Sequence, residues 1–188
     1  MGRLLRQLNQ TIKKQNIMVK KNSIKPALLV IDVQKISLNY IPETDIEPAL
    51  AVINMYIERF RSHGCPIIRI YHHNPLLQGD WTEDFEFPES LKIQPGDPKI
   101  VKTRPDAFHK TELNEVLRKL GCNTLFVCGL SATGCALATW IGAFNYDYHA
   151  FLIKDALMSP KKAHTENIES MFDAVGPDVI KLVLENVG

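Results

Sequence analysis

The residue with the clearest potential for chemistry is Cys135, which follows a loop of small residues, Gly129-Leu-Ser-Ala-Thr-Gly134. The loop comes after an apolar run typical of a buried strand, and the pattern from Cys135 onward is that of a helix. A cysteine at a helix N-terminus lies near free N–H groups and the positive end of the helix dipole, which favour a thiolate. The same N–H groups can bind the oxyanion of an attacked carbonyl. Cys135 is therefore a candidate nucleophile.

Two charged residues stand at the ends of other predicted strands. Asp32 closes the apolar run that begins at Ala27, and Lys102 closes a short run that begins at Lys99. An unpaired carboxylate at the end of a buried strand is costly, so Asp32 needs a partner or a role. A lysine beside Cys135 would lower the pKa of the thiol, and a carboxylate could accept its proton. The alternative is a structural Asp32–Lys102 ion pair beside a core cysteine, and the spacing alone does not decide between the two.

Predicted strands and helices alternate along the chain, and this order determines where those residues would meet. Strands are predicted at 27–32, 66–71, 99–102, 124–129, 149–153 and 179–184, and helices at 48–63, 111–120, 135–145 and 160–174. The alternation indicates right-handed βαβ units, and so a parallel sheet with helices on both faces. Ligands in such folds bind beyond the carboxyl ends of the strands. The stretch 74–96, rich in proline, glycine and aromatic residues, is predicted to cover that edge.

Composition and charge limit the class of protein. The chain has 188 residues and a formal net charge of +1, with 45% hydrophobic and 23% charged residues. These values are typical of one soluble globular domain, and they provide no basic field for a nucleic-acid partner. We find neither an apolar run long enough to span a membrane nor a secretory signal, and therefore predict a cytoplasmic protein. The four cysteines have the spacing of neither a disulfide framework nor a zinc site.

Residues 1–23 differ from the rest of the chain. They carry six basic residues and no acidic one, and Leu4, Leu8 and Ile12 recur at helical spacing. A basic amphipathic helix can lie on a membrane surface or serve in targeting, but we favour a surface or subunit-bridging extension. We leave its function unassigned, note that Met18 is an alternative start, and take residues 24–188 as a separate domain.

Four motifs, in order, resemble the isochorismatase-like cysteine hydrolases, a group that includes nicotinamidase, N-carbamoylsarcosine amidohydrolase and isochorismatase. The motifs are Leu28-Leu-Val-Ile-Asp-Val-Gln34; Val101-Lys102 with Asp106-Ala-Phe108 and Thr111-Glu-Leu113; Val127-Cys-Gly-Leu-Ser-Ala-Thr-Gly-Cys135; and Cys135-Ala-Leu-Ala-Thr139. The resemblance covers roughly residues 25–185. It implies a three-layer α/β/α Rossmann-like fold with a six-stranded, mostly parallel sheet, and a homo-oligomer, either a dimer or a tetramer.

The resemblance also implies a site and an activity. It assigns a catalytic triad to Asp32, Lys102 and Cys135, and an oxyanion hole to the N–H groups of Ser131 and Cys135. It implies a cis peptide bond between Leu130 and Ser131, which would turn the Ser131 N–H toward that of Cys135. The implied reaction is hydrolysis of a C–N bond in a small amide or carbamoyl substrate through a thioester, without a cofactor.

The walls of the substrate cavity are less defined by sequence. We expect substrate-binding residues at Gln34, Tyr71, His72, Trp81 and Phe108. Nicotinamidases hold a metal with an Asp-x-His pair after the second strand, whereas this chain has His72 and Asn74 there. We therefore expect no metal, with His72 in the pocket wall and His73 on the surface.

The position two residues after the nucleophile also departs from the related amidohydrolases. Leu137 stands where those that bind an acidic substrate have an arginine, which argues against a carboxylate held in that way unless Arg104 or Lys154 takes over.

Three other functions remain open at this stage. The first is an isochorismatase-type hydrolase of a vinyl ether, which would use Asp32 as an acid and need no thioester. The second is an idle family member that binds a ligand or partner through the same cleft. The third is a redox role for Cys128 and Cys135, although their positions make a disulfide geometrically doubtful.

Overall fold

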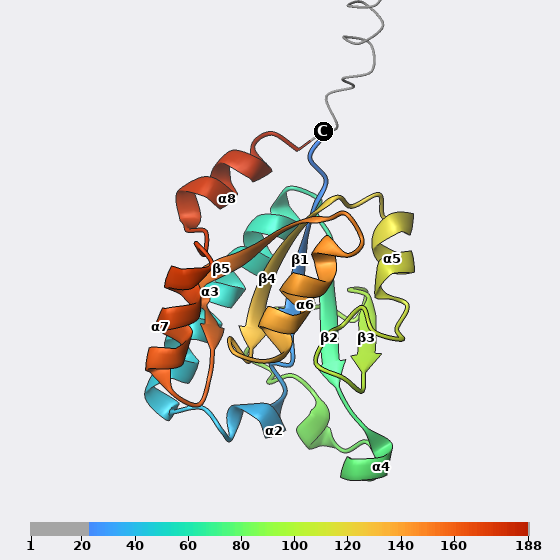
Figure 1. The fold of residues 1–188 in the computed structure, drawn as a ribbon, viewed down its shortest axis with the longest axis vertical. Helices are drawn as coiled ribbons and strands as arrows, with labels where there is room; N and C mark the ends of the chain where they lie inside the picture. The colour runs from blue at the N-terminus through green and yellow to red at the C-terminus, as the bar shows by residue number, and fades with distance from the viewer. Residues whose placement is uncertain (1–22, 188) are drawn as a thin grey trace, which may run out of the picture.

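The computed structural model describes residues 23–187, which form a five-stranded parallel sheet between two layers of helices (Figure 1). The strand order is β3-β2-β1-β4-β5. The strands are β1 (Pro26–Ile31), β2 (Ile67–His72), β3 (Lys99–Lys102), β4 (Thr124–Leu130) and β5 (His149–Met158). The helices are α2 (Lys35–Leu38), α3 (Glu43–Ser62), α4 (Pro75–Gln78), α5 (Leu113–Lys119), α6 (Cys135–Phe144), α7 (Lys162–Met171) and α8 (Pro177–Leu184), with a 3₁₀ turn, η1, at Glu83–Phe85. The extension at 1–23 lies outside the described residues apart from Ser23.

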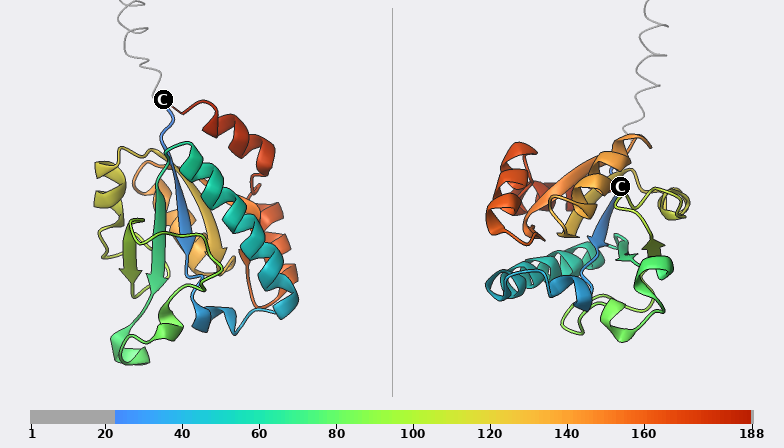
Figure 2. Two further views of the ribbon diagram at one scale, coloured as in Figure 1. Left: turned by 180° about the vertical axis from the view of Figure 1, so that it is seen from behind. Right: turned by 60° about the horizontal axis from the view of Figure 1, so that its bottom comes forward.

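Each face of the sheet carries its own apolar layer. Side chains of β1 alternate between the two faces, so that Leu28 and Val30 join the layer under α3 whereas Leu29 and Ile31 join the layer under α5 and α6. All of β1 is buried, as expected for a central strand covered on both faces. The view from behind shows α3 lying across one face of the sheet (Figure 2). These findings confirm the predicted α/β fold class.

The carboxyl ends of the strands point to the same end of the molecule, where α2 and α4 lie (Figure 1). Asp32 follows β1 and has a positive φ of 51°, a conformation that aspartate tolerates better than most residues. Gly129 in β4 also has a positive φ, 107°, and a Cβ there would lie 2.1 Å from the carbonyl oxygen of Ile31. Because glycine permits this close approach, the loop after β4 begins directly beside the end of β1.

The predicted sixth strand is wrong, because residues 177–184 form helix α8. Gly176 and Pro177 stand at the start of the helix and Asp178 lies in its first turn, which are helix-start features. Ile180 and Leu184, four residues apart, are buried in the same apolar layer as α3. The β-branched residues suggested a strand, but the burial spacing is that of a helix. A single parallel bridge between Ile24 and Val187 follows the helix.

Two other predicted elements differ in extent. Helix α3 begins at Glu43 and continues through Pro48, and β5 extends to Met158 through an irregular register opposite Val127 and Gly129. Within residues 23–187, no helix has both the length and the apolar character that a bilayer span requires.

Candidate active site

Asp32, Lys102 and Cys135 lie together at the carboxyl edge of the sheet, although 103 positions separate the first from the last. The ammonium of Lys102 is 2.7 Å from Oδ2 of Asp32, and both side chains are buried. The Asp32 carboxylate and the Cys135 sulfur lie within 4.8 Å of each other. Oδ1 of Asp32 is buried and has no hydrogen-bond partner among the described residues, so one carboxylate oxygen is available to accept a proton.

His72, at the end of β2, is a fourth member of this cluster. Its Nδ1 is 3.2 Å from the Lys102 ammonium, 3.8 Å from the Cys135 sulfur and 3.9 Å from Oδ2 of Asp32. Burial and the nearby Lys102 charge lower the pKa of His72, which keeps the ring neutral. A neutral Nδ1 can accept a hydrogen bond from Lys102, which directs the ammonium between the imidazole and Asp32.

The thiol is more strongly protonated than the sequence suggested. Burial, followed by the charge of Asp32, raises the pKa of Cys135 to about 12, and Lys102 offsets only part of this. Burial likewise raises the pKa of Asp32 above its ordinary value, despite the opposing effect of Lys102. The expectation of a low-pKa thiol at Cys135 is therefore wrong: Lys102 lowers the pKa as expected, but burial and Asp32 outweigh it. The arrangement instead suits a thiol that loses its proton to a basic carboxylate as it attacks.

The loop between β4 and α6 brings Ser131 and Cys135 to the wall of one cavity. The Leu130–Ser131 peptide bond is cis. The carbonyl of Ser131 accepts hydrogen bonds from the N–H groups of Gly134, at 2.9 Å, and Ala136, at 3.2 Å, which closes the turn at the start of α6. The N–H groups of Ser131 and Cys135 donate to no other backbone group in the described part of the chain. They are thus available as an oxyanion hole.

The sulfur opens into a cavity of about 490 Å³. Its lining comes from the ends of β1, β2 and β4, from the start of α6, from α2 and the turn after it, from α4 and from the residues after β5: Asp32, Ile36, Ser37, Tyr40, Ile41, His72, Gln78, Leu130, Ser131, Thr133, Cys135 and Pro160. This volume suits a small organic molecule. Sequence reasoning missed the α2 wall, because a four-residue helix has no periodicity to detect.

Comparison with known proteins is consistent with this arrangement. The sequence matches the Isochorismatase domain over residues 26–181. The chain belongs to the isochorismatase family of hydrolases. An isochorismatase family protein of Bacillus subtilis, YddQ, is 31% identical over 142 residues, which is 69% of this chain and 76% of that protein. Ureidoacrylate amidohydrolase RutB of Caulobacter segnis is 34% identical over 102 residues, but the match spans only 52% of this chain and 42% of RutB.

Solved structures of the isochorismatase family share the fold. An isochorismatase from Pseudomonas putida has a TM-score of 0.68 at 26% identity, covering 81% of this chain and 86% of that one. N-carbamoylsarcosine amidase from Thermoplasma acidophilum has a TM-score of 0.67 at 22% identity, covering 81% of this chain and 95% of that one. At that identity, the second likeness shows the fold alone.

Of the residues expected to bind substrate, only His72 lines the cavity of this family member. Tyr71 is buried against Phe87 at a centroid distance of 4.2 Å, and Trp81 packs on Tyr71 at 5.6 Å. Phe108 is buried under α6 and stacks on Tyr146 at 5.0 Å. These aromatic side chains fill the apolar layers, so the structure does not place them near the sulfur.

Three further expectations concern residues around the site. His73 is buried against Trp81 and Phe85 and is not the surface residue that we expected. Leu137 packs into the apolar layer under α6, and neither Arg104 nor Lys154 lines the cavity. The redox alternative has no support from the geometry, because the Cys128 thiol is buried and directed at the carbonyl of Leu29.

Gln34 holds the backbone around His72 instead of facing the cavity. Its Oε1 accepts the N–H of His72 at 2.7 Å, and its Nε2 donates to the carbonyls of Phe85, at 2.8 Å, and His72, at 3.2 Å. The side chain is fully buried. It therefore connects β1 to the end of β2 and to the turn at η1.

Replacement of Gln34 by leucine should lower the free energy of unfolding by about 2–4 kcal/mol, because the variant leaves buried backbone groups of His72 and Phe85 unpaired. Urea unfolding followed by circular dichroism measures this change. If Gln34 contacts substrate instead, the variant should keep its stability and show only a higher KM.

The residues around the sulfur do not fit a metal ion. Ligand atoms of Asp32, His72 and Cys135 all lie within 4.8 Å of one another, close enough to share an ion. However, the Lys102 ammonium is 2.7 Å from Asp32 and 3.2 Å from His72. An ion held by these atoms would meet a positive charge at hydrogen-bond distance, which is unfavourable.

Proposed function

We propose that the chain is a cysteine amidohydrolase that cleaves the C–N bond of a small amide or carbamoyl compound through a thioester at Cys135. The observation that carries the proposal is the position of the Cys135 sulfur. It lies at the start of α6, within 4.8 Å of a buried carboxylate, and it faces a cavity of small-molecule size. Among relatives, RutB is named as an amidohydrolase of ureidoacrylate, which supports C–N bond chemistry.

In the first half of the reaction, Asp32 takes the proton of the Cys135 thiol while the sulfur attacks the carbonyl carbon. The negative charge that develops on the carbonyl oxygen is stabilised by the N–H groups of Ser131 and Cys135. The tetrahedral intermediate then collapses, the C–N bond breaks, and Asp32 returns the proton to the leaving nitrogen. The products of this half are the free amine or ammonia and a thioester.

In the second half, Asp32 accepts a proton from water as the water oxygen attacks the thioester. The C–S bond breaks, the sulfur regains a proton, and the acid leaves. Lys102 keeps its charge throughout. It stabilises the Asp32 carboxylate at 2.7 Å, and its charge also favours negative charge on the sulfur.

The raised pKa values of Asp32 and Cys135 fit these roles. A carboxylate with a raised pKa is a better base toward the thiol and, once protonated, still a sufficient acid toward the leaving nitrogen. The thiol needs no permanent ionisation, because the proton has an acceptor beside it.

The direct test is a screen of small amides, ureas and carbamoyl compounds for ammonia release, followed by acid quench of the reacting enzyme within the first turnovers. Mass spectrometry should then find the acyl or carbamoyl group on the peptide that contains Cys135. Steady ammonia release with an unmodified Cys135 under conditions that slow deacylation, such as low pH, would contradict covalent catalysis.

A further inference from the structure

Building on the proposed function, we propose that the substrate is an uncharged amide or urea carrying an apolar group, and that residues 36–41, which comprise most of helix α2 and the turn after it, select it. The proposal rests on the lining of the cavity beside Cys135. Five lining residues present apolar or aromatic surface: Ile36, Tyr40, Ile41, Leu130 and Pro160. The remaining lining residues, apart from the catalytic cluster, are neutral polar ones: Ser37, Gln78, Ser131 and Thr133.

The charges in the cavity disfavour an anionic substrate. Among the described residues, neither an arginine nor a lysine belongs to the lining, and the one charged lining group is the carboxylate of Asp32. The ammonium of Lys102 is fully buried behind Asp32 and engaged by it at 2.7 Å and by His72 at 3.2 Å. A substrate carboxylate would therefore lose its hydration without gaining a cation, and it would face the negative charge of Asp32.

A cationic substrate is disfavoured for a different reason. The anionic group that it would find in the lining is the Asp32 carboxylate, the proposed base, and an ion pair there would hold back the proton transfer from Cys135. A neutral molecule avoids both conflicts. Its carbonyl meets the N–H groups of Ser131 and Cys135, and its apolar part lies against residues 36–41.

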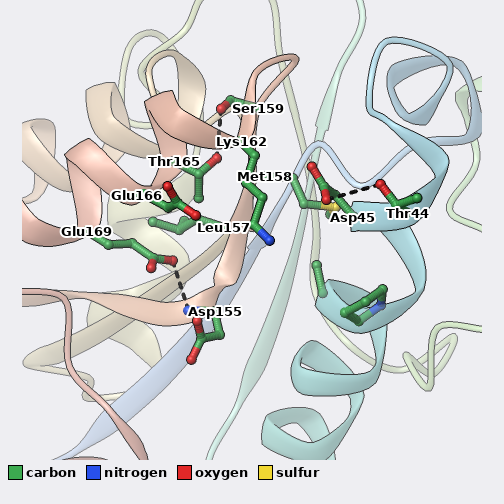
Figure 3. A pocket seen from close by; sticks show the side chains of 12 residues that line it. Thr44, Asp45, Asp155, Leu157, Met158, Ser159, Lys162, Thr165, Glu166 and Glu169 are labelled. Carbon is green, nitrogen blue, oxygen red and sulfur yellow. Dashed lines mark hydrogen bonds between the residues drawn. The ribbon is translucent and has the colours of Figure 1, made fainter.

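Charged residues do gather elsewhere in this molecule, so the neutral lining is a local property. A smaller hollow of about 190 Å³ lies between α3, β5 and α7 (Figure 3). There the side chain of Lys162 extends among acidic residues: Asp45, Asp155, Glu166 and Glu169. Such a lining would suit ionic groups, in contrast to the cavity of Cys135.

Two contacts of Lys35 anchor helix α2 to the η1 region. The N–H of Lys35 donates to the carbonyl of Glu86 at 2.9 Å, and its ammonium pairs with Glu83 at 2.6 Å. These contacts join the first residue of α2 to η1 and to Glu86, the residue that follows η1. Ile36 thus belongs to an anchored helix, whereas Tyr40 lies in the turn that follows α2, lines the cavity and is 73% exposed.

The test compares pairs of compounds that differ in charge and little in shape: methyl adipamate with adipamic acid, and methyl 4-ureidobenzoate with 4-ureidobenzoate. Ammonia release gives kcat/KM, and we expect each neutral ester to exceed its acid by at least about tenfold, the cost of an unpaired carboxylate in a buried site. Equal values, or a preference for the acids, would overturn the proposal.

Variants of Ser37, in α2, test whether this helix determines the preference for neutral substrates. Ser37→Arg adds a cation to the lining and should reduce the preference for the neutral compound at least several-fold, whereas Ser37→Gln, which adds bulk without charge, should leave the preference in place. An unchanged preference in Ser37→Arg would show that α2 does not determine it.

Binding to the Cys135→Ala protein separates this proposal from the proposed function. Calorimetry should show tighter binding of the ester than of the acid in each pair. Tighter binding of the acids would overturn the charge preference. If the esters bind but the active chain releases no ammonia from any compound, the amidohydrolase proposal fails while the preference for neutral ligands stands.

Discussion

Replacement of Cys135 by alanine is expected to reduce ammonia release by about 10⁴-fold or more, the scale on which enzymes lose turnover when a covalent nucleophile is removed. The free energy of unfolding should change by less than about 1 kcal/mol, because the side chain is only half-buried at the cavity wall. Steady-state kinetics and urea unfolding measure the two quantities. The combination of a large loss of rate with intact stability distinguishes a nucleophile from a structural cysteine.

A matched control is available in the same chain. Cys65 is buried away from the cavity, so Cys65→Ala should keep turnover and lose some stability, the opposite pattern. If Cys135→Ala retains activity comparable with the Cys65→Ala protein, the sulfur of Cys135 forms no covalent intermediate. A reaction that depends on Asp32 alone, such as vinyl-ether hydrolysis, would then be the better hypothesis.

The sequence predicted the parts of the molecule in which a residue pattern has a single physical explanation. Continuous apolar runs such as residues 27–31 predicted central strands, because only burial on both faces accounts for them. In parallel sheets the carboxyl ends of strands meet at one edge, so Asp32 and Lys102 at two strand ends implied the cluster that the structure contains. Spacing alone did not decide between a structural ion pair and a catalytic site with Cys135. The resemblance of the motifs to the family favoured the catalytic site.

Other features depend on packing that a sequence does not reveal. The β-branched residues of 177–184 are compatible with strand or helix, and the contact of Ile180 and Leu184 with the layer under α3 decides for the helix. Trp81 and Phe108 have the character of ligand-binding aromatics, but the structure places them in apolar layers. The pKa of Cys135 likewise depends on burial, which together with the charge of Asp32 outweighs the effect of Lys102.

Asparagine at position 32 should change two properties of the site in opposite directions. Turnover should fall by about 10²–10⁴-fold, because the base that accepts the thiol proton is gone. Alkylation of Cys135 by iodoacetamide at neutral pH should become faster, since the variant removes the negative charge that raises the thiol pKa and leaves the Lys102 ammonium without an anionic partner.

In the unmodified protein, with a thiol pKa of about 12, the alkylation rate should rise with pH up to pH 10 without a plateau.

The substitution suits the backbone, because asparagine also tolerates the positive φ of 51° at this position. Asp106→Asn is the matched control: its carboxylate is half-buried beside α6, and the amide oxygen can still accept the N–H of Phe108, now 2.9 Å from Oδ1. That control should leave both rates close to those of the parent. Rates of alkylation are followed by mass spectrometry of the Cys135 peptide, below the unfolding temperature of each protein. If Asp32→Asn slows alkylation and turnover together, Asp32 assists ionisation of the thiol in the resting enzyme, and the direct proton transfer that the geometry favours is not the first step.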